Sequence, residues 1–200
     1  TKLVLAGKNI EDLLHLPEME DPDKLAIMKM LMFITPVASQ SGSLLFPLMA
    51  LAMVRLSVKY GNSIYSSYAY SGYGAMLCDK FGDIDSGYRF GQLGVKLLYK
   101  MNAYSLKAKV YMIFNTMIKH FKEPASNTLC HLIEGMQSGL ETGDLIFSSY
   151  NAFFFSQHLW CCHNALDIVA KDVSKYIELT GNNSKSKSHN LGLKIISQTI

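Results

Sequence analysis

The chain lacks the residue patterns of a disulfide framework or a zinc ribbon. It has four cysteines, none of them in a C-x-x-C pair, at positions 78, 130, 161 and 162. A disulfide framework needs a regular spacing, and adjacent Cys161 and Cys162 do not easily reach disulfide geometry with each other. We therefore expect free thiols and a reducing, cytoplasmic setting.

A nucleotide-binding loop is also missing. The stretch GDIDSG (82–87) has the glycine spacing of a phosphate loop. Such a loop needs Lys followed by Ser or Thr after its second glycine, whereas Tyr88 and Arg89 stand there in this chain. The sequence has no G-x-S-x-G elbow, no H-E-x-x-H helix and no kinase loop set. We expect neither a cofactor nor a catalytic residue in this segment.

The chain carries little net charge. The 19 Lys and Arg residues and the 16 Asp and Glu residues leave a net charge of +3, and basic residues gather only in NNSKSKSHN (182–190). Nucleic-acid binding requires a basic face, so we expect no nucleic-acid partner. The uncharged run 38–54 is shorter than the ~20 apolar residues of a membrane span and is interrupted by polar or helix-breaking residues. We expect no membrane partner either.

The ends of the sequence are typical of a piece of a longer protein. Thr1 is not an initiator methionine and begins no signal-peptide pattern, and Ile200 lies in an apolar, helix-like stretch. A length of 200 residues with 49% hydrophobic composition suffices for one core or a short array of repeats. We expect residues 1–200 to be one fragment of a larger helical-repeat domain.

Glycine followed by Asp or Asn recurs along the chain. These pairs are Gly61-Asn62, Gly82-Asp83, Gly143-Asp144 and Gly181-Asn182. Glycine commonly follows the last residue of a helix, and Asp or Asn soon after it can cap the next helix. The separations are close to multiples of about 20 residues, which predicts repeated helical hairpins with a period of about 41 residues.

Between these turns the apolar spacing is helical. One predicted buried stripe within 104–121 consists of Leu106, Val110, Phe114, Met117, Ile118 and Phe121. Asp21-Pro22 predicts the N-cap and first turn of a helix that stops before Pro36, and Pro124 predicts the first position of a helix over 124–142. No segment alternates clearly enough to be a strand, so we expect an all-α fold.

Small residues also recur at helical spacing. They form stripes on three predicted helices, namely Ser67, Ser71 and Gly74, then Gly87, Gly91 and Gly94, then Gly135 and Gly139. An interior glycine costs a helix about 1 kcal/mol relative to alanine, so several of them indicate a compensating gain in packing. We expect these faces to let neighbouring helices approach closely, as tetratricopeptide-like hairpins require.

The richest polar cluster lies in HLWCCHNALD (158–167). On a helix His158 and Cys162 are four residues apart, as are His163 and Asp167, so a zinc or haem ligand pair is possible. The alternative interpretation is a helix end with half-buried histidines and core cysteines, because cysteine is usually buried. Only two ligands would share a face, which favours the second interpretation.

Two other residue sets bear on chemistry. Adjacent Cys130 and His131 are not expected to form a catalytic dyad, because neighbouring side chains on a helix point about 100° apart. Aromatic side chains are abundant, and we expect most of them in the core. They include Tyr60, Tyr65, Tyr68, Tyr70, Tyr73, Tyr88, Phe90, Tyr99, Phe153, Phe154, Phe155 and Trp160. The alternative is that some of these aromatic side chains line a site for a peptide or a hydrophobic small molecule.

Four stretches together resemble a known family. They are LPEMEDPDKLAIMKML (16–31), KYGNS (59–63), FGDIDSGYRFGQLGVKLL (81–98) and EGMQSGLETGDLIFSSYNAFFF (134–155). The set is similar to the helical region of large bacterial signalling proteins. In those proteins a serine/threonine kinase domain is followed by a predicted signal-transduction ATPase, this helical region, a GAF domain and a sensor histidine kinase. The resemblance covers nearly the whole chain and fades after about Leu179.

The resemblance implies a tetratricopeptide-like superhelix of antiparallel hairpins that follows an ATPase module. It implies a regulatory or scaffolding segment without its own active site, in a parent that is a serine/threonine or histidine protein kinase. The implied partners are neighbouring domains of the same polypeptide, or another protein or peptide on the concave face. No kinase, P-loop or phospho-acceptor residue of the family matches a position in this chain.

The expected organisation has three parts. Residues 1–43 hold N-terminal helices and a loop, residues 44–181 hold about three and a half hairpins, and residues 182–200 hold a polar turn and the start of another helix. The alternative function is an α-helical sensor module that binds a hydrophobic small molecule or a metal.

Overall fold

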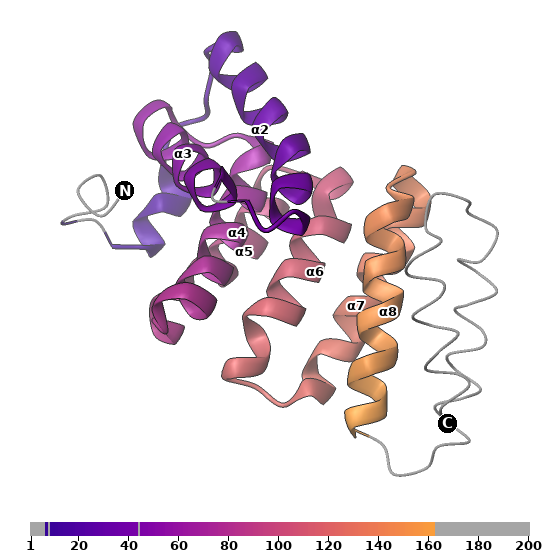
Figure 1. The fold of residues 1–200 in the computed structure, drawn as a ribbon. Helices are drawn as coiled ribbons and strands as arrows, with labels where there is room; N and C mark the ends of the chain where they lie inside the picture. Colours follow the sequence, from indigo (N-terminus) through magenta and orange to yellow (C-terminus); the bar gives the residue numbers. More distant parts are fainter. Residues whose placement is uncertain (1–6, 8, 44, 163–200) are drawn as a thin grey trace. The chain divides into compact units, whose positions relative to one another are not determined.

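The computed structural model describes residues 7, 9–43 and 45–162, and this part of the chain is all-α (Figure 1). Its only extended pairing is an isolated bridge between Glu18 and Asn62. The chain divides into two compact units, Thr1–Leu106 and Lys107–Ile200. The predicted all-α class is confirmed for the described residues, whereas the tetratricopeptide-like superhelix and its period stay predictions.

The described part of the first unit contains four α-helices and two short 3-10 helices. In chain order they are η1 (Glu11–His15), α2 (Pro22–Gln40), α3 (Leu45–Tyr60), α4 (Ile64–Phe81), α5 (Ile84–Lys100) and η2 (Tyr104–Leu106). Helices α2 and α3 pack on each other, α3 packs on α4, and α4 packs on α5.

The second unit contains three α-helices in its described part. The elements are α6 (Lys107–Met117), η3 (Lys119–Phe121), η4 (Ala125–Thr128), α7 (Leu129–Thr142) and α8 (Leu145–Cys162). Helix α8 packs on both α7 and α6. The core between α7 and α8 is built from Leu132, Met136, Ala152, Phe155 and Leu159. None of the helices in the described residues of either unit is both long and apolar enough to cross a bilayer.

Helix α2 begins where the sequence predicts and ends later. The Asp21 side chain caps it by accepting hydrogen bonds from the N–H groups of Asp23 (2.9 Å) and Lys24 (3.2 Å). The predicted stop before Pro36 is wrong, because the helix continues to Gln40. A proline removes one backbone hydrogen bond, and burial of Thr35 and Ala38 on either side of Pro36 offsets that loss.

The connection between α3 and α4 is held by Asn62, which is buried. Its N–H donates to the Pro17 carbonyl (2.7 Å) and its side-chain amide donates to the Leu13 carbonyl (2.7 Å). Its side-chain oxygen accepts from the Tyr70 hydroxyl (3.1 Å). The expectation that Asn62 caps the next helix is therefore wrong, because Ser63 is the N-cap and Asn62 binds the segment that precedes α2.

Gly61 is required by this connection for two reasons. Its φ of 101° lies in the region that side chains rarely adopt. A Cβ at this position would also lie 3.0 Å from the Glu18 carbonyl carbon and even closer to the Pro17 carbonyl oxygen. Any larger residue would therefore separate the chain before α2 from the end of α3.

Helices α4 and α5 form the tightest pair in the first unit. Gly82 follows α4 in the left-handed conformation, and the Asp83 carboxylate accepts from the Ser86 N–H (3.1 Å) at the start of α5. A Cβ on Gly87 would lie 2.7 Å from the Gly74 carbonyl oxygen, so the two backbones nearly touch. Beside this contact, the rings of Tyr73 and Phe90 pack edge to face with centroids 4.8 Å apart.

Small residues also lie at the contact between α7 and α8. A Cβ on Gly135 would lie 2.8 Å from the Asn151 side-chain carbon, and one on Gly139 would lie 2.7 Å from the Ser148 Cβ. Gly143 follows α7 in the left-handed conformation, and the Asp144 carboxylate forms an ion pair with Lys109 of α6.

The chain between α6 and α7 departs from the predicted long helices. The α-helix ends at Met117, and Ile118 leaves the helical conformation (φ −130°) before η3 begins. This change of direction exposes Met117 and Phe121, which were expected in a buried stripe, whereas Val110, Phe114 and Ile118 are buried as expected. Pro124 does not open α7; it precedes η4, and α7 begins at Leu129.

Candidate functional site

The predicted metal ligands are not brought together in the described part of the chain. His158 is half-buried, and its Nδ1 lies 2.6 Å from the Thr128 hydroxyl. Cys162 is exposed at the end of α8, and His163 and Asp167 lie outside the described residues, as does Gly181 of the predicted turns. No group of three or more His, Cys, Asp or Glu side chains is placed to hold a metal ion among the described residues.

The expectation of core cysteines at this helix end is wrong, because Cys161 and Cys162 are both exposed. Trp160 is also exposed, as is Tyr99 of α5. Helix α8 buries the side that faces α6 and α7. Trp160, Cys161 and Cys162, near the end of α8, lie outside that side.

A buried lysine organises a polar cluster that the sequence did not indicate. The Lys119 ammonium donates to the Asn127 carbonyl (2.9 Å), lies 3.6 Å from the Glu123 carboxylate and lies 3.5 Å from the His131 Nδ1. The same imidazole nitrogen lies 3.3 Å from the Asn115 side-chain oxygen. Because Lys119 already has three partners, the cluster holds the chain between α6 and α7 in place rather than offering a free ammonium group.

Burial affects the histidines of the second unit. Burial, followed by the positive charge of Lys119, lowers the pKa of His131. Burial and the nearby His120 lower the pKa of His158. Both imidazoles are therefore neutral near pH 7. Cys130, next to His131 in sequence, is exposed, whereas the His131 Nδ1 lies beside Lys119 and Asn115.

Five of the large hydrophobic side chains that are exposed in the described part of the chain lie on α2. We call this surface the α2 apolar face, and it comprises Ile27, Met30, Phe33, Ile34 and Val37. These positions follow the helical spacing, and Phe33 and Val37 are 60% and 67% exposed. The opposite side of the same helix buries Met28 and Met32 in the core. Helix α2 is thus apolar on both sides, and only one side is covered.

An open groove adjoins this face between α2 and α3. This α2–α3 groove has a volume of about 520 Å³. It is lined by Ile27, Leu31, Ala52, Arg55, Leu56, Val58, Lys59 and Tyr60. None of these residues is buried, so the groove is open to solvent. The groove brings the first half of α2 beside the second half of α3, because the two helices are antiparallel neighbours.

The charged groups at the groove are positive. Arg55 and Lys59 line it, and no carboxylate does. The Lys59 and Lys24 ammonium groups lie 4.8 and 5.5 Å from the centre of the Tyr60 ring. A hydrogen bond from Lys59, with the charges of Lys59 and Lys24, lowers the pKa of the Tyr60 hydroxyl although Asp21 opposes this. Local potential at this end of the groove is positive.

The sequence contained a partial signal for this site. The segment MKMLMFITPV (28–37) places apolar residues around the whole circumference of the helix, and the uncharged run 38–54 continues into α3. A helix that is apolar all round is usually buried. The sequence therefore predicts core rather than surface here, and only the packing shows which side stays uncovered.

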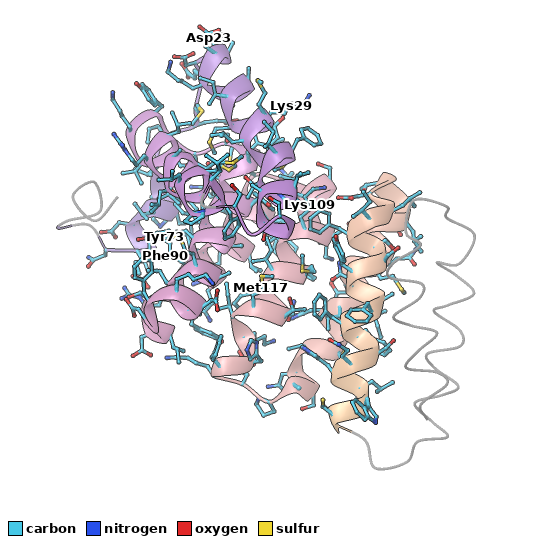
Figure 2. All side chains as sticks on the ribbon, in the orientation of Figure 1. Asp23, Lys29, Tyr73, Phe90, Lys109 and Met117 are labelled. Atoms are coloured by element: carbon cyan, nitrogen blue, oxygen red, sulfur yellow. The ribbon has the colours of Figure 1, made fainter. Side chains whose placement is uncertain are left out.

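Within the described residues, the predicted turn residues lie in helix connections, and Gly87, Gly94, Gly135 and Gly139 lie at helix contacts rather than at this groove. In Figure 2 the labelled Tyr73 and Phe90 lie together between α4 and α5, whereas Asp23 and Lys29 lie along α2. Comparison of the chain with known protein families, with curated proteins and with solved structures yields no match.

Proposed function

We propose that this chain is a non-catalytic docking and scaffolding segment that binds a segment of another polypeptide, or of another domain, along the α2–α3 groove. The observation that carries the proposal is the α2 apolar face, whose side chains are about half exposed or more at Phe33, Ile34 and Val37. Contiguous apolar surface on a helix is costly to leave in water and marks a site of interaction.

The composition of the groove supports docking over catalysis. Its lining contains no Ser, Cys, His, Asp or Glu, so the described groove offers no carboxylate or imidazole base, and its titratable side chains are Arg55, Lys59 and Tyr60. The resemblance to the helical region of large bacterial signalling proteins supports a regulatory role. In this proposal the parent is a cytoplasmic protein kinase with an ATPase module, and partner binding biases the activity of the adjoining domains.

A second candidate is a site for a hydrophobic small molecule. The groove volume of about 520 Å³ lies within the range of small-molecule sites. Such sites usually bury most of the ligand surface, however. Exposed Ile27 and Arg55 leave this groove open, which favours a polypeptide segment over a small molecule.

Site-specific photo-crosslinking tests the proposal. A photoreactive phenylalanine analogue replaces Phe33 in the protein produced in its native cells, and the matched control carries it at Phe81. The two phenylalanines are 60% and 63% exposed, and Phe81 lies at the end of α4, away from the groove. We expect a polypeptide adduct from position 33 and none from position 81.

Either of two results would overturn the docking function: no adduct at position 33, or equal adducts at both positions. Native mass spectrometry of the same protein tests the second candidate. A co-purifying small molecule that is lost on Ile27→Asp would favour a ligand site over a docking surface.

A further inference from the structure

We propose that the occupant of the α2–α3 groove is an amphipathic helix that carries Asp or Glu beside its apolar face, concentrated at the end that lies over Tyr60. This inference rests on the proposed docking function and adds the chemistry of the partner. It follows from three features of the groove: its walls, its spacing and its charge.

The walls of the groove favour a helix over an extended strand. Both walls are α-helices, α2 and α3, whose backbone N–H and C=O groups are already paired within each helix. A strand binds mainly through main-chain hydrogen bonds to an exposed sheet edge, and the groove offers none. A proline-rich segment needs an aromatic-lined groove, whereas Tyr60 is the only aromatic residue in this lining. Side-chain packing is therefore the available mode of recognition.

The spacing of the lining residues matches such a helix. Ile27 and Leu31 are four residues apart on α2, and Ala52 and Leu56 are four residues apart on α3. Two parallel apolar rows of this kind accept side chains at i, i+3 or i+4, and i+7 of a helix that lies between them. Ala52 leaves room on the α3 side for a larger side chain of the occupant.

The charge of the groove selects an acidic occupant. Arg55 and Lys59 line the groove, and Lys59 and Lys24 lie over the Tyr60 ring; none of the three forms an ion pair within the described part of the chain. By contrast, Arg89 of α5 donates two hydrogen bonds to Glu11, at 2.8 and 2.5 Å. The negative charge that acts on Tyr60 comes from Asp21, whose carboxylate accepts hydrogen bonds from the first N–H groups of α2.

Two designed peptides provide the test. Both carry the same leucine anchors at i, i+4 and i+7, and they differ only in flanking residues, which are Glu in one and Lys in the other. Binding of each fluorescently labelled peptide to the full chain is measured by anisotropy at low and high salt. We expect the Glu peptide to bind about tenfold more tightly at low salt, because several exposed charge pairs each add a small factor.

Three variants locate the effect. The double variant Arg55→Glu with Lys59→Glu is expected to reverse the preference between the two peptides. The control Lys80→Glu with Lys96→Glu changes two exposed lysines of the same unit outside the groove and is expected to leave the preference unchanged. Ile27→Asp, at a position 41% exposed, is expected to weaken both peptides without unfolding the chain.

Each contrary outcome has a distinct meaning. Equal binding of both peptides that is lost on Ile27→Asp would overturn the acidic chemistry while leaving the docking function in place. No binding of either peptide, with a polypeptide adduct at Phe33, would overturn the helical occupant. Self-association of the chain that is lost on Ile27→Asp would make a second copy the occupant and would also overturn this inference. No peptide binding together with no adduct would overturn the docking function itself.

Discussion

The close packing of α4 on α5 makes one substitution pair diagnostic. Gly94 and Gly72 are both interior helix glycines of the same unit, and they differ in what surrounds them. A Cβ on Gly94 would lie 2.7 Å from the Ser67 carbonyl oxygen and closer still to the Ser71 hydroxyl. A Cβ on Gly72 would meet nothing within 4 Å. Alanine at the two positions should therefore change stability in opposite directions.

The expected magnitudes follow from two effects. Replacing an interior helix glycine with alanine stabilises a helix by about 1 kcal/mol, and this effect applies at both positions. Overpacking costs about 1–3 kcal/mol, and the upper end applies at Gly94 because a backbone carbonyl of α4 cannot rotate away as a side chain can. We expect Gly72→Ala to stabilise the chain by about 1 kcal/mol and Gly94→Ala to destabilise it by about 2 kcal/mol.

Urea unfolding of the full chain, followed by circular dichroism, measures both variants against the parent. For a protein of this size a change of about 2 kcal/mol corresponds to roughly 4–8 °C in the thermal midpoint, so thermal unfolding is an independent check. If Gly94→Ala were as stable as Gly72→Ala, the two helices would not pack through these small residues. The packing role assigned to the glycine stripes would then be wrong.

Two further predictions concern the second unit and the thiols. Burial lowers the pKa of His131 and His158 below the usual value of 6.5, so below that pH the unfolded chain binds protons that the folded chain does not. The free energy of unfolding should therefore be highest above about pH 6.5 and should fall toward about pH 5. Replacing both histidines with Gln should flatten this pH dependence. An unchanged slope of unfolding free energy against pH in that variant would refute the role of the two histidines. A thiol reagent should label three cysteines in the folded chain and Cys78 only after denaturation, whereas labelling of Cys78 at the same rate would contradict its burial. The three exposed cysteines are Cys130, Cys161 and Cys162.

Helix boundaries set by local chemistry could be predicted from the sequence. Asp21 caps α2 because its carboxylate reaches N–H groups only two and three residues away. Gly82 and Gly143 follow α4 and α7 because the left-handed conformation at a helix end is a local preference of glycine. These features depend on residues that are neighbours along the chain.

Boundaries that depend on distant residues could not be predicted in this way. Pro36 breaks a helix by local rules, yet α2 continues because Thr35 and Ala38 are buried by other parts of the unit. Asn62 was expected as a cap, whereas its partners are Leu13, Pro17 and Tyr70. Nothing in the sequence around Asn62 identifies the first two.

The candidate site shows the same division. The sequence by itself determined that α2 is apolar around its circumference, that its N-terminus is capped and that Arg55 and Lys59 lie on the next helix. Tertiary packing decided that Met28 and Met32 are buried while Phe33 and Val37 remain in water. The physical reason is that hydrophobic side chains gain free energy on any surface that excludes water, so their pattern does not specify which of two apolar sides finds a neighbour. The packing of α2 against α3 and α4 decides that, and the position of α3 beside α2 also sets the place of the groove.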